Sequence, residues 1–149
     1  MLKTTCTHSE ILRGLAECGH GDRILIADGN YPLDSNTGTD TRLIYLNLTH
    51  GIPLVTDVLK VLEETIAIEK AEVMSPDNSG EPAIFAEFGK ILEDGIEFKK
   101  LGRFEFYDEC RKSDIKLAIA TGEQRTYANI LLTVGVVDTL FCKNIKMKE

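Results

Sequence analysis

The side chain in this sequence best suited to proton transfer is that of His20, in the segment Gly19-His20-Gly21-Asp22. An imidazole gains and loses a proton near neutral pH, which makes histidine the commonest general acid or base. A glycine on either side lets a ligand or a second stretch of backbone approach closely. The same histidine would also serve as a cap for a preceding helix. These four residues therefore leave a catalytic and a structural role open.

Two further groups of polar side chains have the chemistry to bind a polyhydroxylated ligand. Asp28 directly follows an apolar segment, and Tyr127 and Asn129 belong to a later polar stretch. Carboxylate, phenol and amide groups make the hydrogen bonds that sugar hydroxyls need. Arg103 stands among aromatic residues, where a guanidinium can stack on a sugar or hydrogen-bond to it. Each group by itself would equally be ordinary polar surface, so a binding site requires that the fold bring them together.

The elements that must position these residues alternate between helix and strand. Thr7 and Glu10 form a capping-box pattern for a first helix, which is predicted to stop near Gly19. Apolar spacing predicts further helices that open at Pro53 and run over residues 82–93 and 104–112. Apolar or alternating segments predict strands at residues 23–27, 43–46, 66–74, 116–120 and 130–134.

This alternation predicts an α/β fold, because several strands are apolar on both faces and must be covered on both sides. We expect a single three-layer domain over residues 1–149, with a mostly parallel sheet between helices. In such sheets, ligands bind at the C-terminal ends of the strands. Residues 28–32 and 121–129 follow two of the predicted strands, so both loops are expected at that edge.

Bulk composition narrows the classes of protein and partner. The 149 residues are 43% hydrophobic and carry a net charge of -7, which argues against a nucleic-acid-binding protein. No apolar run has the length of a signal peptide or a membrane helix. The four cysteines form no C-x-x-C pair and no zinc-site spacing. We therefore expect a cytoplasmic protein with reduced thiols and no membrane partner, in which Cys18 is a small buried side chain rather than a nucleophile.

Taken together, the clusters resemble the ribose pyranase and L-fucose mutarotase family of the RbsD/FucU type. The resemblance extends from about residue 2 to residue 137. Each motif is short, but their order and separations make chance a poor explanation. The motifs that carry it are Gly19-His20-Gly21-Asp22, Asp28 with Asn30-Tyr31-Pro32, Arg103-Phe104-Glu105-Phe106-Tyr107, Thr121-Gly122-Glu123, Tyr127-Ala128-Asn129-Ile130 and Gly135-Val136.

The resemblance implies an isomerase that interconverts the anomers of a free monosaccharide. It assigns acid–base catalysis to His20. It implies an RbsD-like α/β fold, self-association into a ring that is typically a homodecamer, and sites near the subunit contacts. No metal and no organic cofactor is implied. The residues that it assigns to sugar binding are Asp28, Arg103, Tyr127, Ala128 and Asn129.

The preferred sugar depends on which branch of the family the chain follows. Segment 103–107 is similar to the fucose branch, whereas ribose enzymes tend to have a histidine at the position of Arg103. Segment 46–53 and Ala128 are closer to the ribose branch. L-Fucose is the expected substrate, because Arg103 belongs to the group that should touch the sugar. D-Ribose is the alternative.

Other classes of function remain open at this stage. One alternative is a non-catalytic sugar-binding or transport-accessory protein, which would need no titrating group at His20. Another is that the ring assembly is itself the function. A third is a metal-dependent hydrolase, which would need five side chains to converge. Those side chains are His8, His20, Asp22, Asp28 and His50.

Overall fold

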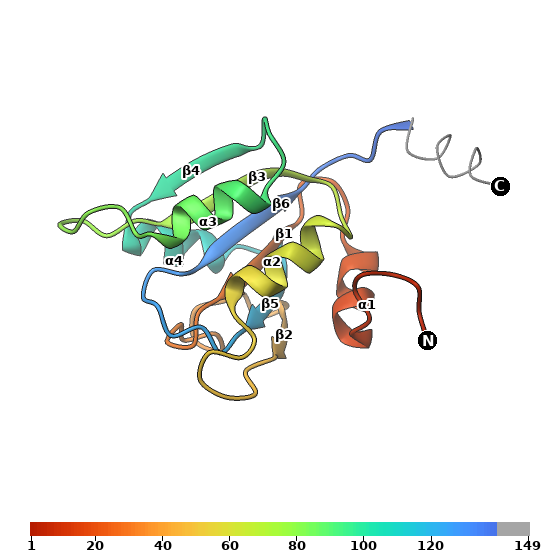
Figure 1. Ribbon diagram of the computed structural model, residues 1–149, viewed down its shortest axis with the longest axis horizontal. Helices are drawn as coiled ribbons and strands as arrows, with labels where there is room; N and C mark the ends of the chain where they lie inside the picture. The colour runs from red at the N-terminus through yellow and green to blue at the C-terminus, as the bar shows by residue number, and fades with distance from the viewer. Residues whose placement is uncertain (140–149) are drawn as a thin grey trace.

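The computed structural model describes residues 1–139, which form one six-stranded sheet with helices on both faces (Figure 1). The spatial order of the strands is β2-β5-β1-β6-β3-β4. The rest of the predicted domain, residues 140–149 with Cys142, lies outside the described residues. The strands are β1 (Arg23–Ala27), β2 (Arg42–Tyr45), β3 (Ile68–Met74), β4 (Glu97–Leu101), β5 (Ile115–Ala120) and β6 (Ile130–Val134).

Two apolar layers pack against opposite faces of this sheet. Helices α1 (Ser9–Glu17), α2 (Val55–Glu63) and α3 (Ile84–Ile91) cover one face, and α4 (Arg103–Cys110) covers the other. Successive residues of a strand point to opposite faces. In β1, Ile24 and Ile26 accordingly join the first layer, while Leu25 and Ala27 join the second. The predicted three-layer α/β architecture is therefore confirmed.

Strand direction determines which loops meet. β1 pairs in parallel with β5, as do β2 with β5 and β3 with β4. Only β6 runs antiparallel, to β1 on one side and to β3 on the other. The ends of β1, β3, β4 and β5 consequently share one edge of the sheet with the start of β6. The opposite edge collects the starts of β1 and β3 and the end of β6.

The structure departs from the sequence-based expectations at three elements. Strand β4 was not predicted, because it is a charged and largely exposed edge strand without an apolar pattern. Pro53 precedes α2 instead of lying in its first turn, and the Asp57 carboxylate accepts the Leu54 N–H at 2.9 Å. His8, rather than Thr7, caps α1 by accepting the Ile11 N–H on Nδ1.

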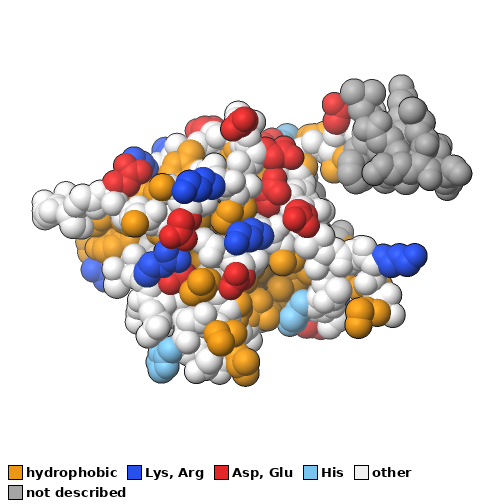
Figure 2. Space-filling model, viewed as in Figure 1, with side chains coloured by type: hydrophobic (Ala, Val, Ile, Leu, Met, Phe, Trp, Pro, Cys, Tyr) orange, Lys and Arg blue, Asp and Glu red, His pale blue; other side chains and the backbone are white. Residues whose placement is uncertain are grey.

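Charged side chains are scattered over the outer surface, as they are along the sequence. Acidic and basic side chains are interspersed over α2 and α3 on the face shown in Figure 2, without a large basic area. None of the helices within residues 1–139 is long and apolar enough to cross a membrane.

Candidate functional site

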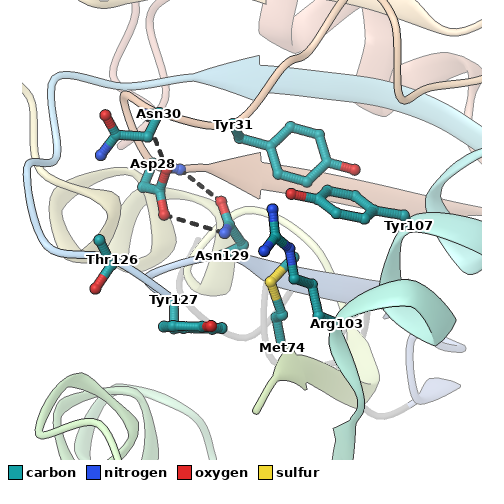
Figure 3. A pocket seen from close by; sticks show the side chains of 9 residues that line it. All are labelled: Asp28, Asn30, Tyr31, Met74, Arg103, Tyr107, Thr126, Tyr127 and Asn129. Carbon is teal, nitrogen blue, oxygen red and sulfur yellow. Dashed lines mark hydrogen bonds between the residues drawn. The ribbon is translucent and has the colours of Figure 1, made fainter. Parts of the chain in front are cut away.

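A cavity of about 230 Å³ opens at the edge where β1, β3, β4 and β5 end (Figure 3). Its size suits one small ligand, since cavities for drug-sized molecules run to about 300–1,000 Å³. Four of the five predicted sugar-binding residues line it, although they come from three separate segments of the chain. The lining residues are Asp28, Asn30, Tyr31, Met74, Arg103, Tyr107, Thr126, Tyr127 and Asn129.

Asp28 is the fixed centre of this cavity. It is buried, and its Oδ2 accepts the Asn129 amide at 3.0 Å and the Ala128 N–H at 3.3 Å. Oδ1 accepts the Asn30 N–H at 2.9 Å, and the Asp28 N–H donates to Asn129 Oδ1 at 2.8 Å. Burial raises the pKa of Asp28, while these hydrogen bonds oppose the rise by favouring the ionised form. The result is a rigid acceptor aimed into the cavity.

Ala128, the fifth residue predicted to bind the sugar, does not line the cavity. Its side chain is fully buried and is not part of the cavity wall. Its backbone N–H instead donates to the Asp28 carboxylate and so joins the loop before β6 to the end of β1. Residue 128 therefore supports the Asp28 carboxylate, and its contact with the sugar stays a prediction.

Ion pairs of Arg125 hold the loop that carries Tyr127 and Asn129 in place. The Arg125 guanidinium donates to the buried Glu123 carboxylate at 3.0 Å and to Glu87 of α3 at 2.7 Å. Tyr127 has φ 58°, a left-handed conformation that non-glycine residues seldom adopt. Such a conformation persists only where the surrounding contacts enforce it, and it turns the phenol ring toward the cavity.

Arg103 enters from the opposite wall at the first residue of α4. Its guanidinium lies 5.8 Å from the centres of the Phe104 and Tyr107 rings, within range of a cation–π interaction. It forms no ion pair with any residue in the described part of the chain. Its donors therefore remain available to a ligand. The Tyr31 and Tyr107 rings, 5.5 Å apart, add an aromatic surface beside it.

This arrangement can recognise a small neutral molecule rich in hydroxyl groups. An anionic acceptor, a cationic donor, two amides and three phenols surround one small space. Charge-assisted hydrogen bonds are the stronger kind, and aromatic rings favour the apolar face of a sugar. No single wall of the cavity carries enough charge of one sign to suit a highly charged ligand.

His20 lies at the other edge of the sheet, away from this cavity. It precedes β1, whereas Asp28 follows it, and five strand residues alone span roughly 17 Å. The imidazole is exposed, and its Nε2 lies 2.9 Å from the Glu69 carboxylate. It does not cap α1, whose C-cap is Cys18. Within one chain, the predicted catalytic residue and the predicted binding residues are thus separate.

The alternative metal site does not form within residues 1–139. His8 caps α1, His20 pairs with Glu69, and Asp28 lies at the far end of β1. No group of three or more His, Cys, Asp or Glu side chains in this range is placed to hold a metal ion. Cys18 is half-buried, and burial raises its pKa to about 11, which disfavours the reactive thiolate.

Five lining residues were not predicted as site residues. Asn30, Tyr31 and Tyr107 belong to motifs that carried the family resemblance, so their neighbourhood was a usable signal. Met74 ends β3 at the same edge as Asp28, which the rule on C-terminal strand ends would have indicated. Thr126 had no signal beyond its place beside Tyr127.

Comparison with known proteins identifies the family to which the chain belongs. The model of the RbsD / FucU transport protein family matches residues 1–137. The chain belongs to the RbsD/FucU family. Among its relatives, a D-ribose pyranase of Staphylococcus haemolyticus is 34% identical over 140 residues, which covers 92% of this chain and 99% of the relative.

Two solved RbsD/FucU structures share the fold. The Bacillus subtilis RbsD complexed with D-ribose is 32% identical, with a TM-score of 0.79, and covers 93% of this chain and 100% of its own. The Streptococcus pneumoniae fucose mutarotase in complex with L-fucose is 26% identical, with a TM-score of 0.72, and covers 88% and 94%. Proteins similar in structure to this chain have thus been solved with each of the two sugars considered above.

Proposed function

We propose that this chain is a sugar mutarotase, an isomerase that opens and recloses the ring of free D-ribose. The observation that carries the proposal is the small cavity at the strand ends, where Asp28, Arg103 and Asn129 present complementary groups to a hydroxyl-rich ligand. The similarity to D-ribose pyranases over nearly the whole chain supports the reaction class.

Ring opening requires only proton transfers at two oxygens. The anomeric hydroxyl loses a proton, the bond from C1 to the ring oxygen breaks, and the ring oxygen takes up a proton. The aldehyde then rotates and closes on its other face. One well-placed acid–base group contributes about 10²–10⁴-fold to such a step. Asp28, Tyr127 and Asn129 would fix the hydroxyl groups while these protons move.

His20 is the proposed acid–base group, and it must come from a second copy of the chain. In one copy it lies beyond the far end of β1 from Asp28, so it cannot reach its own cavity. Self-association that sets the His20 edge of one copy against the cavity of another would complete the site. A homodecameric ring in the cytoplasm remains the prediction, which native mass spectrometry and localisation in cells will test.

L-Fucose is the second candidate substrate. Arg103 favours fucose, because its segment is similar to the fucose branch of the family and its side chain lines the cavity. D-Ribose pyranases that match this chain over nearly its whole length are, however, 30–34% identical to it, whereas the fucose mutarotase is 26% identical. Overall similarity therefore supports ribose better than the single position supports fucose.

Magnetisation-transfer NMR between the anomers of each sugar tests the proposal directly. We expect the protein to accelerate anomer exchange of D-ribose more than that of L-fucose. The reverse order would keep the reaction and change the substrate. Saturable binding of both sugars without acceleration would favour a non-catalytic sugar-binding or transport-accessory protein.

A further inference from the structure

The turn that carries His20 is fastened to the end of β6. The Gly21 N–H donates to the Val134 carbonyl at 2.9 Å, and Gly21 adopts φ 87°, which glycine tolerates best. The Asp22 carboxylate accepts the Gly19 N–H at 2.8 Å. These contacts hold the backbone around His20, but they leave the direction of its side chain to a further partner.

That partner is Glu69, which occupies an irregular position in β3. Ile68 pairs with Val134 and Lys70 with Thr133, so Glu69 is the extra residue of a bulge between β3 and β6. A bulge re-aims a side chain relative to a regular strand. The Glu69 carboxylate accordingly reaches the His20 Nε2 at 2.9 Å, across the end of β6.

Gly135, just after β6, leaves room for Glu69 to reach His20 across the end of this strand. A Cβ atom at that position would lie 3.2 Å from the Glu69 Cβ and 3.3 Å from its backbone nitrogen. Side chains at position 135 would therefore press on the residue that contacts His20. The Gly135 N–H also donates to the Ala67 carbonyl at 2.8 Å, which fixes the two strands at this point.

We propose that Glu69 is the positioning residue for His20 and that Nδ1 of the imidazole exchanges the proton with the sugar. An ionised carboxylate only accepts hydrogen bonds, so the facing Nε2 must carry the proton. The neutral ring then presents its lone pair at Nδ1. This inference rests on the proposed function, because it assigns the working atom of the same acid–base group.

The exposure of the pair supports a role in orientation over one in stability. The His20 and Glu69 side chains are 60% and 46% exposed. Ion pairs as exposed as this one contribute little to the free energy of folding. The pair nevertheless forms at a bulge and beside a closely packed glycine. Fixing the ring of a general acid or base is the function that a carboxylate partner serves in many histidine sites.

The test compares Glu69→Ala and Glu69→Gln with the wild-type protein, with Glu97→Ala as an exposed control on β4. We expect Glu69→Ala to lower the rate at saturating ribose by about 10–100-fold. The KM should change by less than about two-fold, because Glu69 acts through His20 and not on the sugar itself. Glu69→Gln should recover much of the rate, since its amide oxygen accepts the same proton. Glu97→Ala should behave as wild type.

A spectroscopic measurement separates this inference from the function on which it rests. With 15N-labelled histidine, the His20 Nε2–H should give a downfield proton resonance, assigned by its loss in His20→Ala. It should persist in Glu69→Gln and disappear in Glu69→Ala. An unchanged resonance, or a Glu69→Ala rate equal to wild type, would overturn the role of Glu69. A wild-type protein that accelerates no exchange would instead overturn the proposed function.

Discussion

At the scale of single residues, Arg103 is the side chain whose hydrogen-bond donors are most available to a ligand. Its guanidinium rests on two aromatic rings and makes no ion pair with the described residues. We expect Arg103→Ala to weaken ribose binding about 10-fold or more, the worth of a charged hydrogen bond of about 1.5–3 kcal/mol. Titration calorimetry measures this, with Arg111→Ala as a matched arginine outside the cavity. Equal affinities for the two variants would contradict the placement of the sugar beside Arg103.

The raised pKa values of the Cys18 and Cys110 thiols give a prediction about pH. Burial raises the pKa of Cys18 to about 11 and that of Cys110 to about 12, from an ordinary value of 9.0. Both thiols therefore keep their protons in the folded state over a pH range where they ionise in the unfolded state. The free energy of unfolding should fall as the pH rises from about 9 to about 12.

Thiol chemistry checks the same point at milder pH. Both cysteines should react slowly with iodoacetamide at about pH 8 in the folded protein and quickly after denaturation, because the thiolate is the nucleophile. Replacing Cys142 by serine removes the thiol outside the described residues, so that the number of modified thiols refers to the described residues alone. Rapid modification of Cys110 in the folded protein would show that the packing around α4 opens readily.

At the scale of elements, the loop after β5 depends on its close contact with the segment before α2. The Gly122 N–H donates to the Pro53 carbonyl at 2.9 Å. A Cβ atom on Gly122 would overlap the Thr49 carbonyl oxygen and lie 2.6 Å from that of Ile52. We expect Gly122→Ala to cost about 1–3 kcal/mol or more by forcing these backbones apart. Urea denaturation measures the loss.

The control for this variant is Gly80→Ala, where a Cβ atom meets nothing within 4 Å. It should leave the free energy of unfolding within about 0.5 kcal/mol of wild type. If both variants unfold at the same urea concentration, the segment before α2 yields easily and does not position the cavity loop.

A buried ion cluster joins β1, β3 and α4 near the start of β1, at the edge of the sheet opposite the cavity. Arg23 is 6% exposed and contacts Glu72 at 3.2 Å, Glu109 at 2.8 Å and Asp114 at 2.9 Å. Removing one partner of a buried pair leaves an uncompensated charge, so Arg23→Ala should cost about 3–5 kcal/mol. The exposed pair of Arg13 and Glu17 gives a comparison, and Arg13→Ala should cost no more than about 1 kcal/mol. Thermal unfolding measures the loss of stability in both variants. A much larger loss for Arg23→Ala than for Arg13→Ala would show that Arg23 has a structural role.

At the scale of the whole molecule, the separation of His20 from Asp28 makes a subunit-mixing experiment decisive. His20→Ala and Asp28→Ala should each lack mutarotase activity when assembled alone. Unfolding and refolding them together in equal amounts should restore about one quarter of wild-type activity, because one pairing in four combines both intact residues. Absence of any recovery, with mixed oligomers confirmed by mass spectrometry, would show that the two residues do not serve one site.

Most of the architecture could be predicted from periodicity, and most of the cavity from position in the chain. Strands β1 and β6 are apolar on both faces, which is why a covered sheet was predictable. Asp28 follows a strand, and Tyr127 and Asn129 lie between two, so the rule on strand ends placed them together. Strand β4 was not predicted, because an exposed edge strand needs no alternation of apolar and polar residues.

The sequence by itself determined the α/β class, the family and the residues that meet at one edge of the sheet, because local apolar patterns and short motifs carry that information. Only the tertiary structure decided that His20 faces Glu69 at the opposite edge. Chain order puts His20 eight residues before Asp28, but a strand between them extends the chain and carries the two apart. The partner of a side chain at a sheet edge depends on strand order and register, which pair residues that are distant in sequence.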